Sequence, residues 1–167
     1  MENVAFQERF LAEIEKHRKI IYKVCHLYTD TDTDFSDLYQ EIVLHLWKGY
    51  ANFQGKSKIS TWIYKVAINT AIYKLRQDKI KIPFDPLKQD HYDIPDVNDR
   101  EEKEKMEMLK NLIGQLTEIE KAIITLHLDE YSYSDISDII GITKTNVATK
   151  VHRIKKKLSL KKKKKND

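Results

Sequence analysis

Cysteine, glycine and proline are all scarce in this chain of 167 residues, and each scarcity excludes a class of fold or site. A single cysteine, Cys25, permits no internal disulfide and no cysteine metal cluster, and its place on an apolar helical stripe predicts a buried thiol. With only four glycines and no alternation of polar and apolar residues, we expect no strand of consequence. No apolar run approaches the roughly 20 residues of a membrane span, and a polar stretch follows Met1 in place of a signal peptide, so we expect a cytoplasmic protein.

The few prolines divide the chain, because Pro83, Pro86 and Pro95 all lie within one short segment. Proline removes a backbone donor and disfavours helix in the residue before it. The segment 85–104 also holds eight acidic residues against three basic ones. We therefore expect an all-α protein of two small helical domains, residues 1–80 and 105–160, joined by a flexible acidic linker at 81–104. A basic tail at 161–167 follows them.

The C-terminal segment YSYSDISDIIGITKTNVATKVHRIKKKL, residues 131–158, has the pattern of a helix-turn-helix. Ser137 is the small residue where two helices cross, Gly141 permits a left-handed turn, and Thr143 can cap the last helix. From residue 144 to 165 there are eleven Lys or Arg and no acid, which indicates a polyanion partner. The outward face of the last helix carries donors suited to phosphates and base edges: Lys144, Thr145, Asn146, Thr149, Lys150 and Arg153. Further along, the lysines at 155–157 are expected to contact phosphates.

Two segments resemble conserved regions of bacterial sigma factors. FSDLYQEIVLHLWKGYANFQGKSKISTWIYKVAINTAIYKLRQ, residues 35–77, resembles their second region, and the small extracytoplasmic-function (ECF) group of RNA polymerase sigma factors is the best match. The helix-turn-helix, with LTEIEKAIITLHL before it, resembles their fourth region. The resemblance implies a protein that directs core RNA polymerase to promoters, with the first domain melting the −10 element and the second binding the −35 element as duplex.

The resemblance also implies roles for particular residues. The residues expected to face the clamp helices of the polymerase are Asp37, Gln40, Glu41, Leu44 and Trp47. Those expected to hold the −10 strand are Lys56, Ser57, Lys58, Trp62, Lys65, Asn69, Tyr73 and Arg76. Thr143 and the residues on the outward face of the last helix are expected to contact the −35 element. Core packing is the alternative role for Trp62.

The partners implied are the RNA polymerase core, promoter DNA and an anti-sigma protein. We expect no catalytic residues, cofactor, metal site, small-molecule substrate or membrane insertion. The sequence leaves open one other function, a stand-alone helix-turn-helix regulator that binds duplex DNA. Two positions depart from the family pattern, because Glu130 stands where glycine is frequent and Ser137 replaces the usual alanine.

The segment DTDTDFSDLYQE, residues 30–41, raises a further alternative, since its carboxylates follow most of the spacing of a calcium-binding loop. Phe35, however, occupies the position at which such a loop requires glycine. We expect these acids to begin a helix instead, near Ser36, with Ser36 or Asp34 as its cap.

Overall fold

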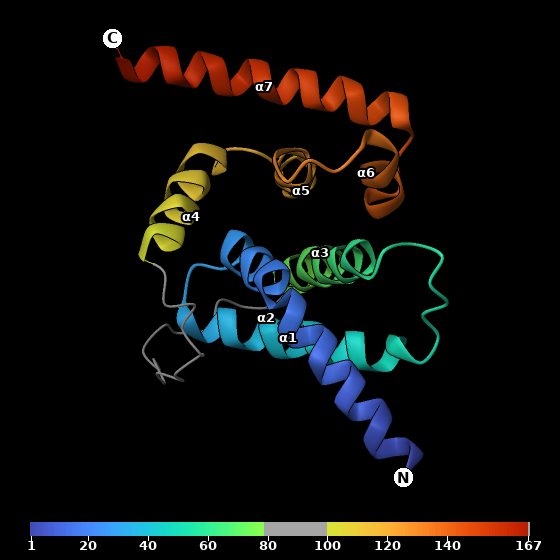
Figure 1. Ribbon diagram of the computed structural model, residues 1–167. Coiled ribbons are helices and arrows are strands. Elements are labelled where there is room, and N and C mark those ends of the chain that lie inside the picture. The colour runs from blue at the N-terminus through green and yellow to red at the C-terminus, as the bar shows by residue number, and fades with distance from the viewer. Residues whose placement is uncertain (79–99, 167) are drawn as a thin grey trace. The chain divides into compact units, whose positions relative to one another are not determined.

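The computed structural model of the chain describes residues 1–78 and 100–166, with side chains through Ser159. Within these ranges every regular element is an α-helix, so the all-α prediction is confirmed for the described part of the chain. The chain forms two compact units, Met1–Asn98 and Asp99–Asp167. Most of the predicted linker at 81–104 lies outside the described residues, and the next described helix begins at Arg100 (Figure 1). Among the helices described, none is long and apolar enough to cross a membrane.

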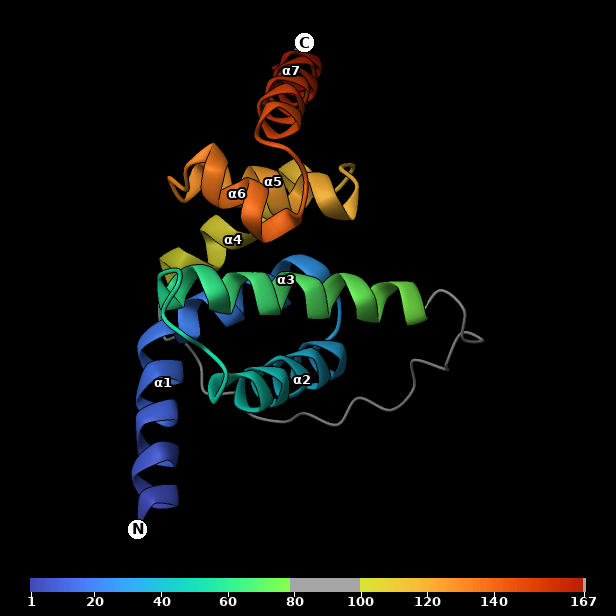
Figure 2. The ribbon, with the colours of Figure 1, turned by 90° about the vertical axis from the view of Figure 1, so that its right-hand side faces the viewer.

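The first unit contains three helices, α1 (Glu2–Tyr28), α2 (Asp32–Tyr50) and α3 (Ile59–Asp78), and each packs against the other two. Spacing of three or four residues places the apolar side chains of each helix on one stripe. These stripes meet in a core whose fully buried members include Ile21, Ile42, Leu46, Ile63 and Tyr64. The loop 51–58 leads from the end of α2 to the start of α3 (Figure 2).

The start of α2 corrects one expectation. The helix begins at Asp32, and its cap is Thr31, whose hydroxyl accepts a hydrogen bond from the backbone N–H of Asp34 at 3.1 Å. Neither Asp34 nor Ser36 is the cap, because Phe35 and Ser36 are buried inside the first turns of the helix. Most of the segment with calcium-loop spacing is therefore helix. Among the described residues no group of His, Cys, Asp or Glu side chains could hold a metal ion.

The thiol of Cys25 is fully buried in this core, as its place on the apolar stripe predicts. Burial raises the pKa of this thiol to about 12, an effect that the positive charge of Lys74 only partly opposes. The thiolate is the reactive form of cysteine, so this side chain packs as a small apolar group.

The second unit contains α4 (Arg100–Ile113), α5 (Glu118–Leu128), α6 (Tyr133–Ile140) and α7 (Lys144–Asn166). Thr117 and Glu120 form a capping box at the start of α5, and the hydroxyl of Ser132 caps α6. Helices α5, α6 and α7 pack against one another around Ile123, Leu126 and Ile136. Both caps coincide with capping signatures in the sequence, Thr117 with Glu120 and Ser132 with Asp135.

Candidate nucleic-acid interface and docking groove

The outward face of α7 is the first candidate interface. Val147, Val151 and Ile154 are buried against α5 and α6, which turns the opposite side of the helix to solvent. Six of the seven residues expected to contact the −35 element are exposed there, and Lys150 is half-buried: Thr143, Lys144, Thr145, Asn146, Thr149, Lys150 and Arg153. Thr145, Asn146, Thr149 and Arg153 recur on the side of α7 opposite its buried residues, whereas Thr143 is the cap of the helix and Lys144 is its first residue.

The turn before α7 fixes how this helix is presented. Gly141 has φ of 81°, in the left-handed region that glycine adopts without steric cost. The hydroxyl of Ser137 donates to the carbonyl oxygen of Ile142, so it joins α6 to the turn. The hydroxyl of Thr143 accepts from the backbone N–H of Asn146 at 3.1 Å and so caps α7. Ser137, which departs from the alanine of the family, thus has a hydrogen-bonding role here.

His152 is a residue that the sequence reasoning missed. It is exposed, and it lies three residues after Thr149 and four before Lys156 on the same side of α7. That spacing alone could have identified it, since residues three and four apart share a helix face. A histidine at this position can donate to phosphate or accept from a base edge.

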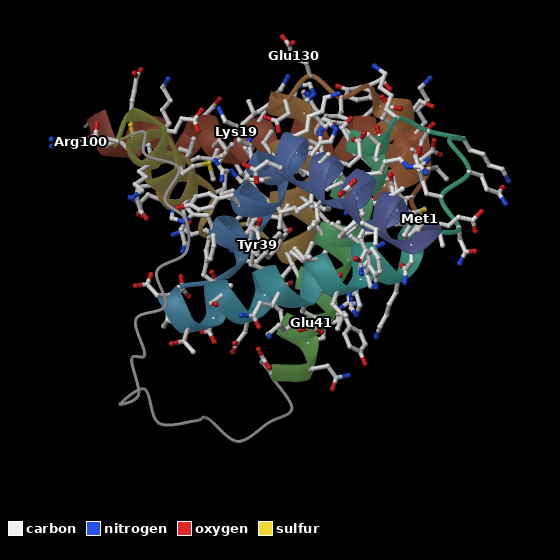
Figure 3. All side chains as sticks on the ribbon, turned by 60° about the horizontal axis from the view of Figure 1, so that its bottom comes forward. Met1, Lys19, Tyr39, Glu41, Arg100 and Glu130 are labelled. Atoms are coloured by element: carbon white, nitrogen blue, oxygen red, sulfur yellow. The ribbon has the colours of Figure 1, made fainter. Side chains whose placement is uncertain are left out.

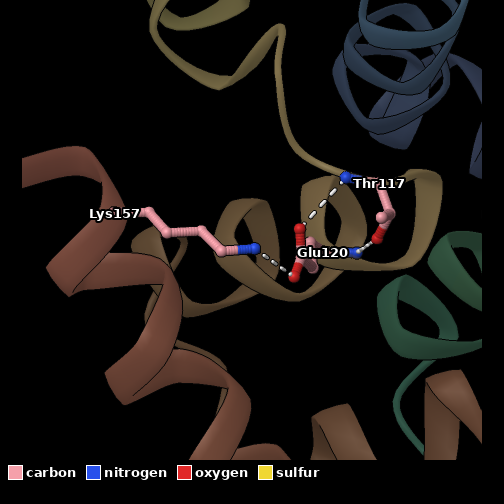
Figure 4. Close-up of polar contacts among 3 residues, drawn as sticks. All are labelled: Thr117, Glu120 and Lys157. Carbon is pink, nitrogen blue, oxygen red and sulfur yellow. Dashed lines mark hydrogen bonds and ion pairs between the residues drawn. The ribbon is translucent and has the colours of Figure 1, made fainter. Parts of the chain in front are cut away.

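Lys157 makes a contact within the fold that the sequence did not indicate, although it remains exposed. Its ammonium nitrogen lies 3.0 Å from Oε1 of Glu120, while Oε2 of Glu120 accepts from the backbone N–H of Thr117 at 3.1 Å (Figure 4). Burial would raise the pKa of the Glu120 carboxyl, but the hydrogen bonds from Thr117 and Lys157 outweigh it, and the pKa lies below its usual value. One carboxylate therefore ties the start of α5 to the later turns of α7.

A groove between α1 and α2 is the second candidate site. Its volume is about 610 Å³ and its lining is mostly apolar. Leu11 of α1 is 62% exposed and Leu44 of α2 is 48% exposed, so two large exposed apolar side chains belong to this one groove. The residues that line the groove are Gln7, Phe10, Leu11, Tyr39, Gln40, Val43, Leu44 and Trp47.

This groove gathers three of the five residues expected to contact polymerase, namely Gln40, Leu44 and Trp47. Asp37 is exposed outside the groove lining. The carboxylate of Glu41 instead accepts from the ammonium of Lys74 on α3 at 3.3 Å. Tyr39 and Glu41, two positions apart on α2, are labelled in Figure 3 and face different neighbours.

Sequence reasoning missed the contribution of α1, whose Gln7, Phe10 and Leu11 complete the groove. The aromatic rings of Phe10 and Trp47 pack edge to face with centroids 5.0 Å apart, which joins the two helices across its floor. Only tertiary packing places these α1 residues beside α2, so no local pattern signals them.

A stripe along α3 is the third candidate site. Lys58, Trp62, Lys65, Asn69, Tyr73 and Arg76 recur at intervals of three or four residues, so they follow one side of the helix. All are exposed except Trp62, which is half-buried. Lys56 and Ser57 are also exposed, in the loop that precedes the helix. The residues expected to hold the −10 strand thus bring basic, amide and aromatic groups to one side of α3 and to the loop before it.

Trp62 both packs and remains accessible. Its ring lies over Phe53, with centroids 5.0 Å apart, and a Cβ added at Gly49 would come within 3.1 Å of its Cζ2. The absence of a side chain at Gly49 therefore lets the indole approach α2 closely. Trp62 is half-buried, so part of its ring packs in the fold and part remains accessible to a ligand.

Polar contacts join α2 to α3 beside this stripe. Thr70 donates its hydroxyl hydrogen to the carbonyl of Val66 at 2.7 Å, so the ring nitrogen Nδ1 of His45, 2.9 Å away, must be the donor to Thr70. The ion pair between Glu41 and Lys74 lies one helical turn further along the same pair of helices. These contacts fix the rotation of α3 relative to α2.

Comparison with known proteins agrees with both units. The Sigma-70 region 2 family matches residues 14–80, and the Sigma-70 region 4 family matches residues 106–158. The RNA polymerase sigma factor YlaC of Bacillus subtilis is 31% identical over 129 residues, which are 73% of this chain and 73% of YlaC. The ECF RNA polymerase sigma-E factor of Haemophilus influenzae is 30% identical over 132 residues, 72% of this chain and 70% of that protein.

The ECF sigma factor SigG of Mycobacterium tuberculosis is 38% identical over 66 residues, but the chain spans only 18% of its length. Among solved structures, the sigma factor RpoE of Bartonella quintana in complex with the anti-sigma factor NepR has a TM-score of 0.59 at 17% identity. The match covers 92% of this chain and 94% of RpoE, and it shows the same fold. These matches confirm the family predicted from the sequence: the chain belongs to the ECF group of RNA polymerase sigma factors.

Proposed function

We propose that this chain is a dissociable initiation subunit that binds core RNA polymerase and directs it to particular promoters. In this proposal the groove between α1 and α2 receives a helical element of the polymerase. The stripe on α3 holds the melted −10 strand, and the outward face of α7 binds the −35 element as duplex. The chain contributes binding energy and positioning and carries out no covalent chemistry.

The groove is the observation that carries this proposal. An exposed apolar trough that contains Leu11 and Leu44 is costly in water and is typical of a protein interface. An amphipathic helix can bind such a trough by placing its apolar residues into it. The flanking amides of Gln7 and Gln40 supply polar contacts at the rim, as specific interfaces require.

The α3 stripe supports the second part of the proposal. Single-stranded DNA is bound by aromatic faces for its bases and by positive charge for its backbone. The partly open ring of Trp62 and the exposed ring of Tyr73 supply the first, and Lys58, Lys65 and Arg76 supply the second.

An anti-sigma protein is the proposed regulatory partner. RpoE, which shares the fold, is solved in complex with the anti-sigma factor NepR. A protein that covered the α1–α2 groove would compete directly with polymerase for Leu11 and Leu44. The two partners are therefore expected to bind this chain in a mutually exclusive way.

Reconstitution with core RNA polymerase tests the proposed function. The wild-type chain is expected to bind core enzyme and to direct promoter-specific transcription. Leu44→Glu and Leu11→Glu are expected to weaken binding to the core enzyme by at least tenfold, because each places a charge in the apolar groove. Leu128→Glu is the matched control, since Leu128 is 57% exposed in the other unit and lies outside the groove.

The opposite outcomes are equally clear. A wild-type chain that fails to bind core enzyme, yet binds duplex DNA by itself as a dimer, would replace this proposal with a stand-alone regulator. Equal loss of binding in Leu44→Glu and Leu128→Glu would show that the groove is not the docking site.

A further inference from the structure

Tyr50, the last residue of α2, lies outside the lining of the groove, yet its ring contacts both neighbouring helices. On the α1 side, the centroid of this ring lies 5.2 Å from that of Phe6 and 5.3 Å from that of Phe10. On the α3 side, it lies 6.5 Å from the centroid of Trp62. At such separations aromatic rings attract one another beyond the effect of buried area. Tyr50 therefore connects α1 to the start of the stripe on α3.

The place of Tyr50 at a helix end makes these contacts important. The last turn of a helix has carbonyl groups without intrahelical partners and tends to fray, so other elements must pack on a side chain there to hold it. Phe10 is 3% exposed and Phe6 is half-buried, so both rings belong to the packed part of α1. The ring of Tyr50, itself half-buried, is thus supported from the α1 side.

The orientation of Trp62 depends on the same end of α2. Its indole lies close to Gly49, which has no side chain that could resist rotation of the ring. Phe53 also contacts the indole, with centroids 5.0 Å apart, but Phe53 belongs to the loop 51–58. Tyr50, in contrast, is part of α2 and is packed against α1. It is therefore a ring contact of Trp62 that the helical core supports.

We propose that Tyr50 is a positioning residue, which holds the indole of Trp62 in the orientation that the −10 strand requires. Aromatic faces bind single-stranded DNA by stacking on its bases, so the direction of the ring face matters. A ring that is already held loses little freedom when the strand binds, and more of the stacking then contributes to affinity. The inference rests on the proposed binding of the −10 strand by the α3 stripe, and it adds a residue of α2 that acts through Trp62.

The test compares removal of the Tyr50 ring with its retention. The full-length chain is reconstituted with core polymerase, and the probe is a fluorescent non-template oligonucleotide from a promoter that the wild-type holoenzyme transcribes. Tyr50→Leu should weaken binding of this single strand by about three- to tenfold, because stacking on a displaced indole is reduced but not abolished. Tyr50→Phe keeps the ring and should bind the strand as the wild type does.

A double-mutant cycle separates positioning from a purely structural role. Trp62→Ala removes the stacking face and should weaken strand binding by about tenfold or more. In the Trp62→Ala chain, Tyr50→Leu should have no further effect, because Tyr50 acts through the indole. A general loss of stability would instead weaken binding in both backgrounds. The matched control is Tyr22→Leu, since Tyr22 is also half-buried in the first unit but packs on Phe35, with centroids 4.9 Å apart.

Tryptophan fluorescence supplies a second measurement that needs neither polymerase nor DNA. The chain has two tryptophans, so Trp47→Phe leaves Trp62 as the only emitter. In this background Tyr50→Leu should make the emission more readily quenched by acrylamide, whereas Tyr50→Phe and Tyr22→Leu should not. Thermal melting checks that each variant is folded at the assay temperature, and Tyr50→Met takes the place of Tyr50→Leu if that variant is not.

Four outcomes would overturn the proposal. The first two are unchanged strand binding in Tyr50→Leu and an equal loss in Tyr22→Leu. The third is an equal loss in Tyr50→Phe, which would assign the effect to the hydroxyl group. The fourth is a further loss from Tyr50→Leu in the Trp62→Ala chain. Unchanged quenching of Trp62 would refute the positioning contact itself. The proposed function fails separately, if the wild-type chain does not bind core polymerase or the promoter strand.

Discussion

Glu130 holds a backbone conformation that glycine adopts more easily. It has φ of 65° and is the one residue other than glycine with positive φ in the described ranges. Two hydrogen bonds impose this conformation after α5, from Glu130 N to His127 O and from Tyr131 N to Leu126 O, each 3.1 Å. This is the Schellman arrangement that commonly ends a helix with glycine. We predict that Glu130→Gly stabilises the second unit.

The magnitude follows from two opposing effects. A left-handed conformation costs a residue with a side chain about 1–2 kcal/mol. Glycine loses more conformational entropy on folding than other residues, which offsets about 0.5–1 kcal/mol of the strain that the substitution removes. The net stabilisation is therefore about 0.5–1 kcal/mol. For a unit of this size that corresponds to an increase in melting temperature of about 2–8 °C.

Glu130→Ala separates the backbone effect from the charge. It removes the carboxylate but keeps a Cβ, so it should not reproduce the gain. The melting temperature is measured by calorimetry on the full-length chain, and hydrogen exchange of α5 amides assigns the change to this unit. Equal stabilisation by Ala and Gly would show that charge is responsible, and no gain from Gly would refute the backbone argument.

Three further substitutions test the packing around the proposed sites. Because the pKa of Glu120 is lowered in the folded chain, its stabilisation is present above its usual pKa of 4.5 and is lost as pH falls through the lower folded value. Glu120→Gln should therefore lower the free energy of unfolding at pH 7 by about 1 kcal/mol. It should also make that free energy depend less on pH in the acidic range, as urea titrations at several pH values would show. Cys25, with its pKa near 12, should resist iodoacetamide at pH 8 in the folded chain and react once urea is added; rapid labelling without urea would contradict its burial. Gly49→Ala should displace the ring of Trp62 and cost about 1–3 kcal/mol, visible as changed tryptophan fluorescence and lower stability; an unchanged spectrum would refute the close approach.

The sequence predicts the second unit well because its signals are local. Thr117 with Glu120 marks the start of α5, Ser132 marks α6, and Gly141 marks the turn. Each signal depends on residues within a few positions of one another, so it can be recognised in the sequence without knowledge of the tertiary structure. The outward face of α7 follows in turn, because the buried face is fixed by Val147 and its neighbours at helical spacing.

The errors and omissions have a common physical origin in contacts that are distant in sequence. The run from Thr29 to Asp34 offers several possible caps, and burial of Phe35 decides in favour of Thr31. Nothing near Lys157 indicates Glu120, which lies in another helix. The α1 half of the groove likewise depends on how α1 packs against α2. Local sequence patterns therefore predict where helices lie and which side of each is buried, whereas the contacts between helices are known only from the structure.

The arrangement of the first unit bears on how melting and docking are related. The groove lies between α1 and α2, and the stripe lies on α3. The contacts of His45 with Thr70 and of Glu41 with Lys74 fix α3 against the same helix that carries Leu44. Because interiors this closely packed deform little, the distance between the groove and the stripe is set by the core of the unit. A change in that core should therefore impair promoter melting even when every residue of the groove and stripe is kept.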